Sequence, residues 1–162
     1  MDIFQLIRSQ DNDRFFSLLK TIDLNIRNEF GQNLLHEAIA CANTLAGVEL
    51  IKCGINVNSQ DSQGLTPLHF AASYRNQVLA KLILEHGGDL LIVDNHGNNP
   101  LWTAVFNARG NYEIVEMLTK SGGDAFQKNK HSKSPLDFAK QIGDLTLVAL
   151  LSKNNLKVGK IQ

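Results

Sequence analysis

A nine-residue phrase occurs twice in this chain and reveals an internal period. Residues 64–72 read GLTPLHFAA, and residues 97–105, which begin 33 positions later, read GNNPLWTAV. The corresponding tetrads NLLH, TPLH and NPLW begin at positions 33, 66 and 99, and a fourth, SPLD, begins two residues late at 134. A period of about 20 to 50 residues is typical of stacked repeats, because one such unit cannot bury its apolar face alone. The period therefore predicts a solenoid.

The tetrads predict helix starts. Each opens with a side chain that accepts hydrogen bonds from free N–H groups at a helix N-terminus: Asn33, Thr66, Asn99 and Ser134. The prolines of the chain follow the last three of these caps, at the first helical position, where a missing N–H costs nothing. Glycines at 54, 87 and 122 follow a second apolar segment and suit a left-handed helix C-terminus. One unit is thus predicted to be a turn, a short helix, a tight connection, a second helix and a loop.

These phrases resemble the ankyrin repeat, whose signature is T-P-L-H-x-A. The resemblance implies an all-α solenoid of stacked helix-turn-helix units, with hairpin-like finger loops and with the first helices lining a concave face. We expect a single domain over residues 1–154, with repeats at 29–61, 62–94 and 95–129 and a C-terminal capping repeat at 130–154. Residues 1–28 are expected to form a diverged N-terminal capping repeat, and residues 155–162 a basic tail.

The third and fourth units depart from the pattern. The third has Trp102 where the second has His69, and two extra residues between Ala104 and Gly110. We expect this insertion to lengthen or kink a helix end that faces a partner; a harmless surface insertion is the alternative. The fourth has Ser132 in place of the usual Gly and Asp137 in place of His.

The charges balance overall but are unevenly distributed. Lys plus Arg and Asp plus Glu both number 16, so no overall field favours a nucleic acid or a membrane as partner. Residues 125–162 carry seven lysines and two acidic residues, a net charge of +5, which leaves −5 on the rest. This gradient could steer a partner of opposite polarity, or it could be a Lys-rich solvated tail. We expect no nucleic acid, because the lysines lack interleaved aromatic residues for base stacking.

Enzymatic chemistry is not indicated. The chain has no GxGxxG, phosphate-loop, HExxH or GxSxG motif. His36 and His69 belong to the repeat pattern, where each ring is expected to bond a neighbouring turn, and Asp61 and Asp94 are expected to support their own turns. We therefore predict no catalytic residues, no cofactor, no metal and no small-molecule substrate.

The cysteines and the apolar runs bear on the compartment. Cys41 and Cys53 lack metal-site or redox spacing and are interpreted as small apolar residues in a reducing environment. The N-terminus has no secretory apolar core, and no apolar run approaches about 18 residues. We expect a cytoplasmic protein that does not enter a membrane.

The resemblance implies that a protein partner is contacted by the fingers and by the exposed side of each first helix. Carried onto this sequence, these positions form one strip: Phe30, Gln63, Leu65, Tyr74, His96, Asn98, Trp102, Phe106, Arg109, Lys130, His131 and Lys133. Aromatic residues and Arg usually contribute most of the binding energy at an interface. The preferred anchors are therefore the aromatic residues of the strip and Arg109.

Some anchors have a competing structural role. Phe30 would cover the diverged first unit, Phe106 would pack under the insertion, and Trp102 would fill the space of the missing His. Tyr74 stands at a position that is usually exposed in the family, which makes it the preferred anchor.

A narrower resemblance concerns biological use. The phrase GNNPLWTAVFNARGNYEIVEML is similar to one in short, free-standing bacterial ankyrin proteins, some of which are immunity proteins of toxin systems. This implies a monomeric inhibitor that binds a cognate toxin or enzyme through its concave face. The alternative is a generic ankyrin adaptor or scaffold that binds another cytoplasmic protein.

Overall fold

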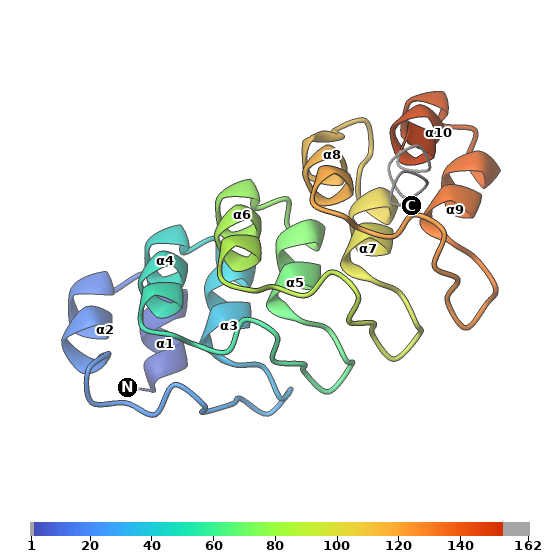
Figure 1. Cartoon of the computed structure of the whole chain (residues 1–162). Helices are drawn as coiled ribbons and strands as arrows, with labels where there is room; N and C mark the ends of the chain where they lie inside the picture. The colour runs from blue at the N-terminus through green and yellow to red at the C-terminus, as the bar shows by residue number, and fades with distance from the viewer. Residues whose placement is uncertain (1, 154–162) are drawn as a thin grey trace, which may run out of the picture.

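The computed structural model describes residues 2–153, in which consecutive helices form pairs that stack side by side (Figure 1). This part of the chain has ten helices and no strand. The helices are α1 Ile3–Arg8, α2 Asn12–Leu18, α3 Leu34–Ala40, α4 Thr44–Lys52, α5 Pro67–Ser73, α6 Gln77–Glu85, α7 Pro100–Phe106, α8 Glu113–Lys120, α9 Pro135–Gln141 and α10 Leu145–Ser152. The all-α solenoid is confirmed; the expected basic tail lies outside the described residues.

The first helix of each repeat begins at its predicted cap. The four caps, Asn33, Thr66, Asn99 and Ser134, directly precede α3, α5, α7 and α9, and each accepts from backbone N–H groups of the first turn. At α7 the Oδ1 of Asn99 lies 2.8 Å from the backbone nitrogen of Trp102, and Pro100 occupies the first helical position. Such a cap contributes about 1 kcal/mol.

The third repeat absorbs its insertion in the connection between its helices. The chain turns from α5 to α6 through residues 74–76, whereas residues 107–112 make the turn from α7 to α8. Helix α7 nevertheless has seven residues, as α5 does. The expectation that the insertion lengthens a helix end is therefore wrong. The extra residues are accommodated at Arg109 and Gly110, which both have positive φ, 44° and 85°.

Each loop from a second helix to the next first helix ends in a hairpin-like turn, which we call a finger: residues 27–32, 60–65, 93–98 and 128–133. In the second finger the backbone N–H of Asp61 donates to the carbonyl of Leu65 at 2.9 Å. The Asp61 carboxylate accepts in turn from the N–H groups of Gln63 and Leu65, both at 2.9 Å. Asp94 makes the equivalent bonds in the third finger. Both aspartates thus support their own turns, as predicted.

Neighbouring fingers are joined by backbone hydrogen bonds. One N–H of each later finger donates to a carbonyl of the finger before it, for example Asn95 to Gln63 at 2.9 Å. The fingers approach so closely that a Cβ atom on Gly64, whose φ is +78°, would lie 2.8 Å from the side chain of Asn95. Ser132, at φ 58°, takes the place of this glycine in the fourth finger. No further finger packs against Ser132 in the described part of the chain.

A buried histidine in each of the first two repeats links its helix to the next finger. His36 Nδ1 accepts from the backbone N–H of Asn33 at 3.2 Å, which leaves the proton of the neutral ring on Nε2. Nε2 lies 3.0 Å from the carbonyl oxygen of Leu65, and His69 makes equivalent contacts one repeat later. Burial lowers the pKa of both rings, that of His36 to about 4. These histidines therefore have the structural role that the repeat pattern predicted.

The core is formed by the same repeat positions. The third residue of every tetrad is buried: Leu35, Leu68, Leu101 and Leu136. The alanines that follow the tetrads are fully buried and allow the first helices to approach closely: Ala38, Ala71, Ala104 and Ala139.

The N-terminal pair α1–α2 packs on α3 and α4 through fully buried apolar side chains and one ion pair. The Nε and Nη2 atoms of Arg8 lie 2.7 and 3.1 Å from the two carboxylate oxygens of Glu37 on α3. This bidentate geometry satisfies a carboxylate that would otherwise be costly to bury. Arg8 therefore allows Glu37 to occupy a buried position on α3.

Leu68→Ala should destabilise the solenoid by about 2 to 5 kcal/mol, because Leu68 is 1% exposed and its truncation leaves a cavity between packed helices. Urea denaturation measures the change in free energy of unfolding. Leu45→Ala is the matched control: Leu45 is 65% exposed, so its loss is expected to stay within about 0.5 kcal/mol. Equal effects of the two variants would contradict the assigned core.

Stability should also fall as the pH is lowered from 7 to 5. His36 has a pKa near 6.5 in the unfolded chain and about 4 in the folded chain. Between these values the unfolded state binds a proton that the folded state does not, so the free energy of unfolding decreases as the pH falls. This linkage amounts to about 2 kcal/mol for His36 over the range from pH 7 to 5, and His69 acts in the same direction. The loss, measured by urea denaturation, should be smaller in His36→Gln and unchanged in His131→Gln. Identical pH dependence of stability in the two variants would contradict the assignment of this loss to His36.

Candidate functional site

The first helices and the fingers meet in an open corner that runs along the stack (Figure 1). We call its exposed and half-buried side chains the inner face; they come from the four fingers and from α5, α7 and α9. This is the surface on which the sequence predicts partner contacts. Arg109 is exposed but lies outside these elements, in the connection between α7 and α8.

Aromatic residues follow one another along the inner face. The ring of Phe70 on α5 stacks with that of Tyr74, the residue directly after this helix, with centroids 6.0 Å apart, and on α7 the rings of Trp102 and Phe106 stack at 5.4 Å. Each pair is spaced by four residues, which places both side chains on one side of the helix. Tyr74 and Phe106 are both 55% exposed, so a large part of each ring is available to a partner.

A third helix contributes to the second aromatic group. Phe138 on α9 lies 5.3 Å from Trp102 and 5.5 Å from Phe106 between ring centroids. We call Trp102, Phe106 and Phe138 the ring cluster. Aromatic pairs at this distance contribute about 0.5 to 1.5 kcal/mol each beyond the area they bury. The ring cluster thus joins the third and fourth repeats, and Phe106 is its exposed member.

Trp102 occupies the position that His69 has one repeat earlier. It is half-buried, and its Nε1 is buried without a hydrogen-bond partner among the described residues. The indole therefore does not bond the fourth finger as His69 bonds the third. Trp102 instead stacks on Phe106 and contacts Phe138.

Two hollows flank the Phe70–Tyr74 pair. An apolar hollow of about 210 Å³ lies toward the third repeat, where Leu65 and Thr103 complete its wall. A wider hollow of about 370 Å³ lies toward the first repeat and includes Phe30 and the Arg8–Glu37 ion pair. Tyr74 lines both hollows, so a side chain bound in either one would touch it.

Most of the predicted contact residues on the fingers are exposed. Phe30, Gln63 and His96 are exposed at the tips of the first three fingers, and their carbonyls accept the backbone bonds between fingers. On the fourth finger the exposed residues are Lys130, His131 and Lys133.

Asn98 is less available than the other predicted contacts. Its side-chain nitrogen donates to Asp94, and its side-chain oxygen accepts from Asn129 at 2.8 Å. Because its side-chain amide already links two fingers, Asn98 is not among the proposed partner contacts.

The fourth finger is positively charged. Residues 128–137 hold three lysines and one acid, Asp137, a net charge of +2. The Asp137 carboxylate accepts from the backbone N–H of Ser134 at 3.0 Å. This bond, above all, lowers the pKa of Asp137, and the nearby charges of Lys128 and Lys133 lower it further. Asp137 is therefore a cap for α9 with two lysines close by.

The sequence interpretation missed Phe70 and Phe138 as part of this surface. Both occupy the same position in the repeat, directly after the tetrad, in PLHF and PLDF. The signal was available, because Phe70 and Tyr74 have the same four-residue spacing as Trp102 and Phe106. What the sequence did not reveal is that Phe138 reaches across to the rings of α7.

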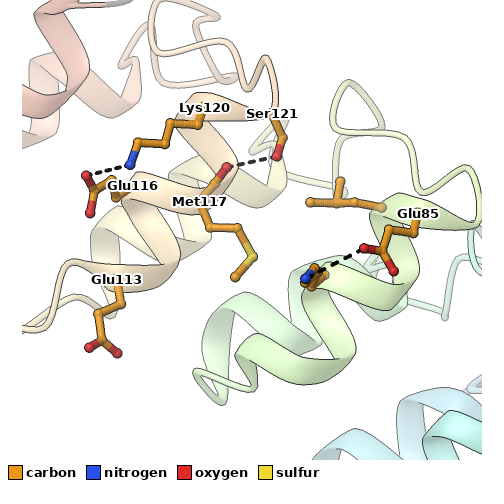
Figure 2. Close-up of a pocket in the computed structure, with 8 residues that line it drawn as sticks. Glu85, Glu113, Glu116, Met117, Lys120 and Ser121 are labelled. Atoms are coloured by element: carbon orange, nitrogen blue, oxygen red, sulfur yellow. Dashed lines mark hydrogen bonds and ion pairs between the residues drawn. The ribbon is translucent and has the colours of Figure 1, made fainter.

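A second groove lies on the other row of helices, between α6 and α8, with a volume of about 480 Å³. Figure 2 shows Met117 of α8 directed toward α6 at this groove. Four of its charged side chains are paired along their own helices, Lys120 with Glu116 at 2.9 Å and Lys81 with Glu85 at 3.9 Å, and Glu113 accepts from the side chain of Gln77. Since these groups already have partners, the groove offers a weaker basis for recognition than the inner face.

Residues 2–153 contain neither a metal-binding cluster nor a membrane-spanning helix. No group of three or more His, Cys, Asp or Glu side chains is arranged to hold a metal ion. No helix in this part of the chain has both the length and the apolar character needed to cross a bilayer.

Comparisons with known proteins place the chain among repeat proteins. A family model described as "Ankyrin repeats (3 copies)" matches residues 3–89 and 39–129. SMC5-SMC6 complex localization factor protein 1 of Bos taurus is 34% identical over 128 residues, which are 75% of this chain and 12% of that protein.

Two other relatives match the same share of this chain. Rabankyrin-5 of Mus musculus is 33% identical over 122 residues, and the transient receptor potential cation channel subfamily A member 1 homolog of Caenorhabditis elegans is 30% identical over 125 residues. Each match covers 75% of this chain but 10% of the relative. The match therefore spans about a tenth of the length of each of these three relatives.

Proposed function

The chain belongs to the ankyrin-repeat family, and from this premise we propose that it binds a partner protein through its inner face. Ankyrin repeats generally mediate binding to other proteins, and the family is typically non-catalytic. The proposed contacts are the aromatic residues of α5 and α7, the tips of the fingers and the lysines of the fourth finger. Arg109 belongs to the proposal only if the partner also reaches the α7–α8 connection.

The observation that carries this proposal is the exposure of Tyr74 and Phe106, each 55%, within one row of rings. More than half of each ring is left to solvent, and aromatic anchors often dominate the energy of a protein interface. The apolar hollow beside Tyr74 would receive a side chain of the partner.

A narrower part of the proposal is that the bound protein is a toxin or an enzyme that this cytoplasmic chain inhibits. It rests on the resemblance of residues 97–118 to short bacterial ankyrin proteins. The relatives described above come from animals, and their names do not mention toxins. The alternative, an adaptor that recruits its partner without inhibiting it, uses the same inner face.

Capture of the partner tests the proposal. The tagged chain is expressed in its native cell, and proteins that remain bound in stoichiometric amount are identified by mass spectrometry. We expect the free chain to be monomeric by light scattering and to form a complex of defined stoichiometry. Failure to recover a stoichiometric protein would count against the binding function.

Tyr74→Ala should weaken binding of the captured partner by at least about 1 kcal/mol, or about fivefold in Kd, because Tyr74 lines both hollows of the inner face. The melting temperature should change little, since the ring is 55% exposed. Calorimetric titration measures the affinity. Phe126→Ala is the matched control, an aromatic residue 40% exposed outside the inner face, and it should bind like the wild type. An unchanged affinity of Tyr74→Ala would remove Tyr74 from the interface.

Inhibition and recruitment are separated by assaying the captured partner. If the partner is a toxin or an enzyme, an equimolar amount of this chain should abolish its activity, and Tyr74→Ala should require a higher concentration. Full partner activity in the saturated complex would reject inhibition and favour the adaptor. A toxin gene directly beside the gene for this chain would further support the inhibitor.

A further inference from the structure

The inner face differs in charge from one end to the other. The first finger carries Arg27 and Glu29, which cancel, and the second and third fingers each carry one aspartate. The fourth finger carries Lys128, Lys130 and Lys133 and no acid. A partner that lies along the inner face therefore meets positive charge at the fourth repeat.

The positive finger leads directly into the helix that carries one ring of the cluster. Lys133 precedes Ser134, the cap of α9, and Phe138 is the fourth residue of that helix. Phe138 lies 5.3 to 5.5 Å from Trp102 and Phe106 between ring centroids. The fourth repeat thus presents lysines on its finger and an apolar ring on the helix that follows, and a ligand that matches both is apolar and acidic.

We propose that the ring cluster and the fourth finger form one site for an acidic segment of the partner protein that carries a bulky apolar side chain. The apolar side chain rests on Phe106 and the ring cluster, while carboxylates of the segment face Lys128, Lys130 and Lys133. This inference rests on the proposed function and specifies the chemistry of the partner at the C-terminal half of the inner face.

An acidic protein segment fits these residues better than a nucleic acid does. The rings of the cluster pack against one another with interplanar angles of 21° to 40°, which leaves no slot between them for a base. The positive charge is confined to one finger, whereas a nucleic-acid backbone is usually followed by a basic groove. The asymmetric charge would instead orient a polar protein partner along the inner face.

Tryptophan fluorescence can report on this site directly, because Trp102 is the single tryptophan of the chain. The first probe is a synthetic peptide of glutamates around a Phe-Leu pair. Three comparison probes are a lysine peptide with the same Phe-Leu pair, a glutamate peptide with Ala-Ala in its place, and oligothymidine. We expect a saturable, salt-sensitive change in Trp102 fluorescence with the first probe and a much weaker response to the others.

Two variants locate the response. Lys130→Glu combined with Lys133→Glu should weaken binding of the first probe about tenfold at low salt. Phe106→Ser, which introduces the residue found at this position in the second repeat, Ser73, should also weaken it. The control with the same change in charge is Lys81→Glu combined with Lys120→Glu, on the α6–α8 groove, and it should bind like the wild type. Thermal melts establish that all the variants are folded.

An equal or stronger response to the lysine peptide or to oligothymidine would overturn the inference, as would equal effects of the two double charge reversals. The captured partner provides a second, separate readout. If Tyr74→Ala weakens the complex but reversal at Lys130 and Lys133 does not, the acidic-segment site is wrong while the proposed function stands. If the charge reversal weakens the complex about tenfold and the groove control does not, the inference is supported.

Discussion

The hydrogen bond from a buried histidine to the next finger sets the geometry on which the other features depend. His36 accepts at Nδ1 from its own helix cap and lies 3.0 Å from the carbonyl of Leu65 at Nε2. One side chain therefore closes the start of its helix and positions the finger of the neighbouring repeat. Because ankyrin units are not stable alone, such contacts between neighbours transmit order along the stack. Burial keeps the ring neutral, which preserves the acceptor on Nδ1 for the N–H of the helix cap.

The same repeat position explains where a binding surface could develop. Trp102 stands where a histidine would bridge to the fourth finger. That finger keeps the backbone bond that joins all neighbouring fingers, from Lys130 N–H to the carbonyl of His96, and it also has a bond from the Asn129 amide to Asn98. It is thus held without a bond from Trp102. Its ring can then support Phe106 and Phe138 on the inner face. At this repeat position, the third repeat thus lacks the histidine bond to the next finger and has a member of the ring cluster instead.

The period made most of the architecture predictable from the sequence. Caps, helix starts and buried leucines recur in fixed columns, so each was supported by several copies at once. The insertion was misjudged because the sequence locates extra residues but does not say whether a helix or its connection absorbs them. The connection absorbs them, because it runs over residues 107–112 in the third repeat and over 74–76 in the second.

Contacts between repeats were harder to predict. The availability of Asn98 depends on the Asn129 amide of the next finger, and the role of Phe138 depends on the distance between α7 and α9. Both are properties of packing rather than of any single phrase. Phe70 and Phe138 share one repeat position, directly after the tetrad, and this shared position indicated that both could belong to the surface. A resemblance to the family instead directs attention to the variable exposed positions.

Ser132 has a consequence for the number of repeats the stack can hold. In the second finger the bare Cα of Gly64 leaves room for Asn95, whose nitrogen would lie 2.9 Å from an added Cβ. Ser132 brings such a Cβ to the corresponding place in the fourth finger. A designer who wished to lengthen this array at its C-terminal side would first have to change Ser132 to glycine. With Ser132, the fourth finger could not receive a following finger in the way that Gly64 receives Asn95.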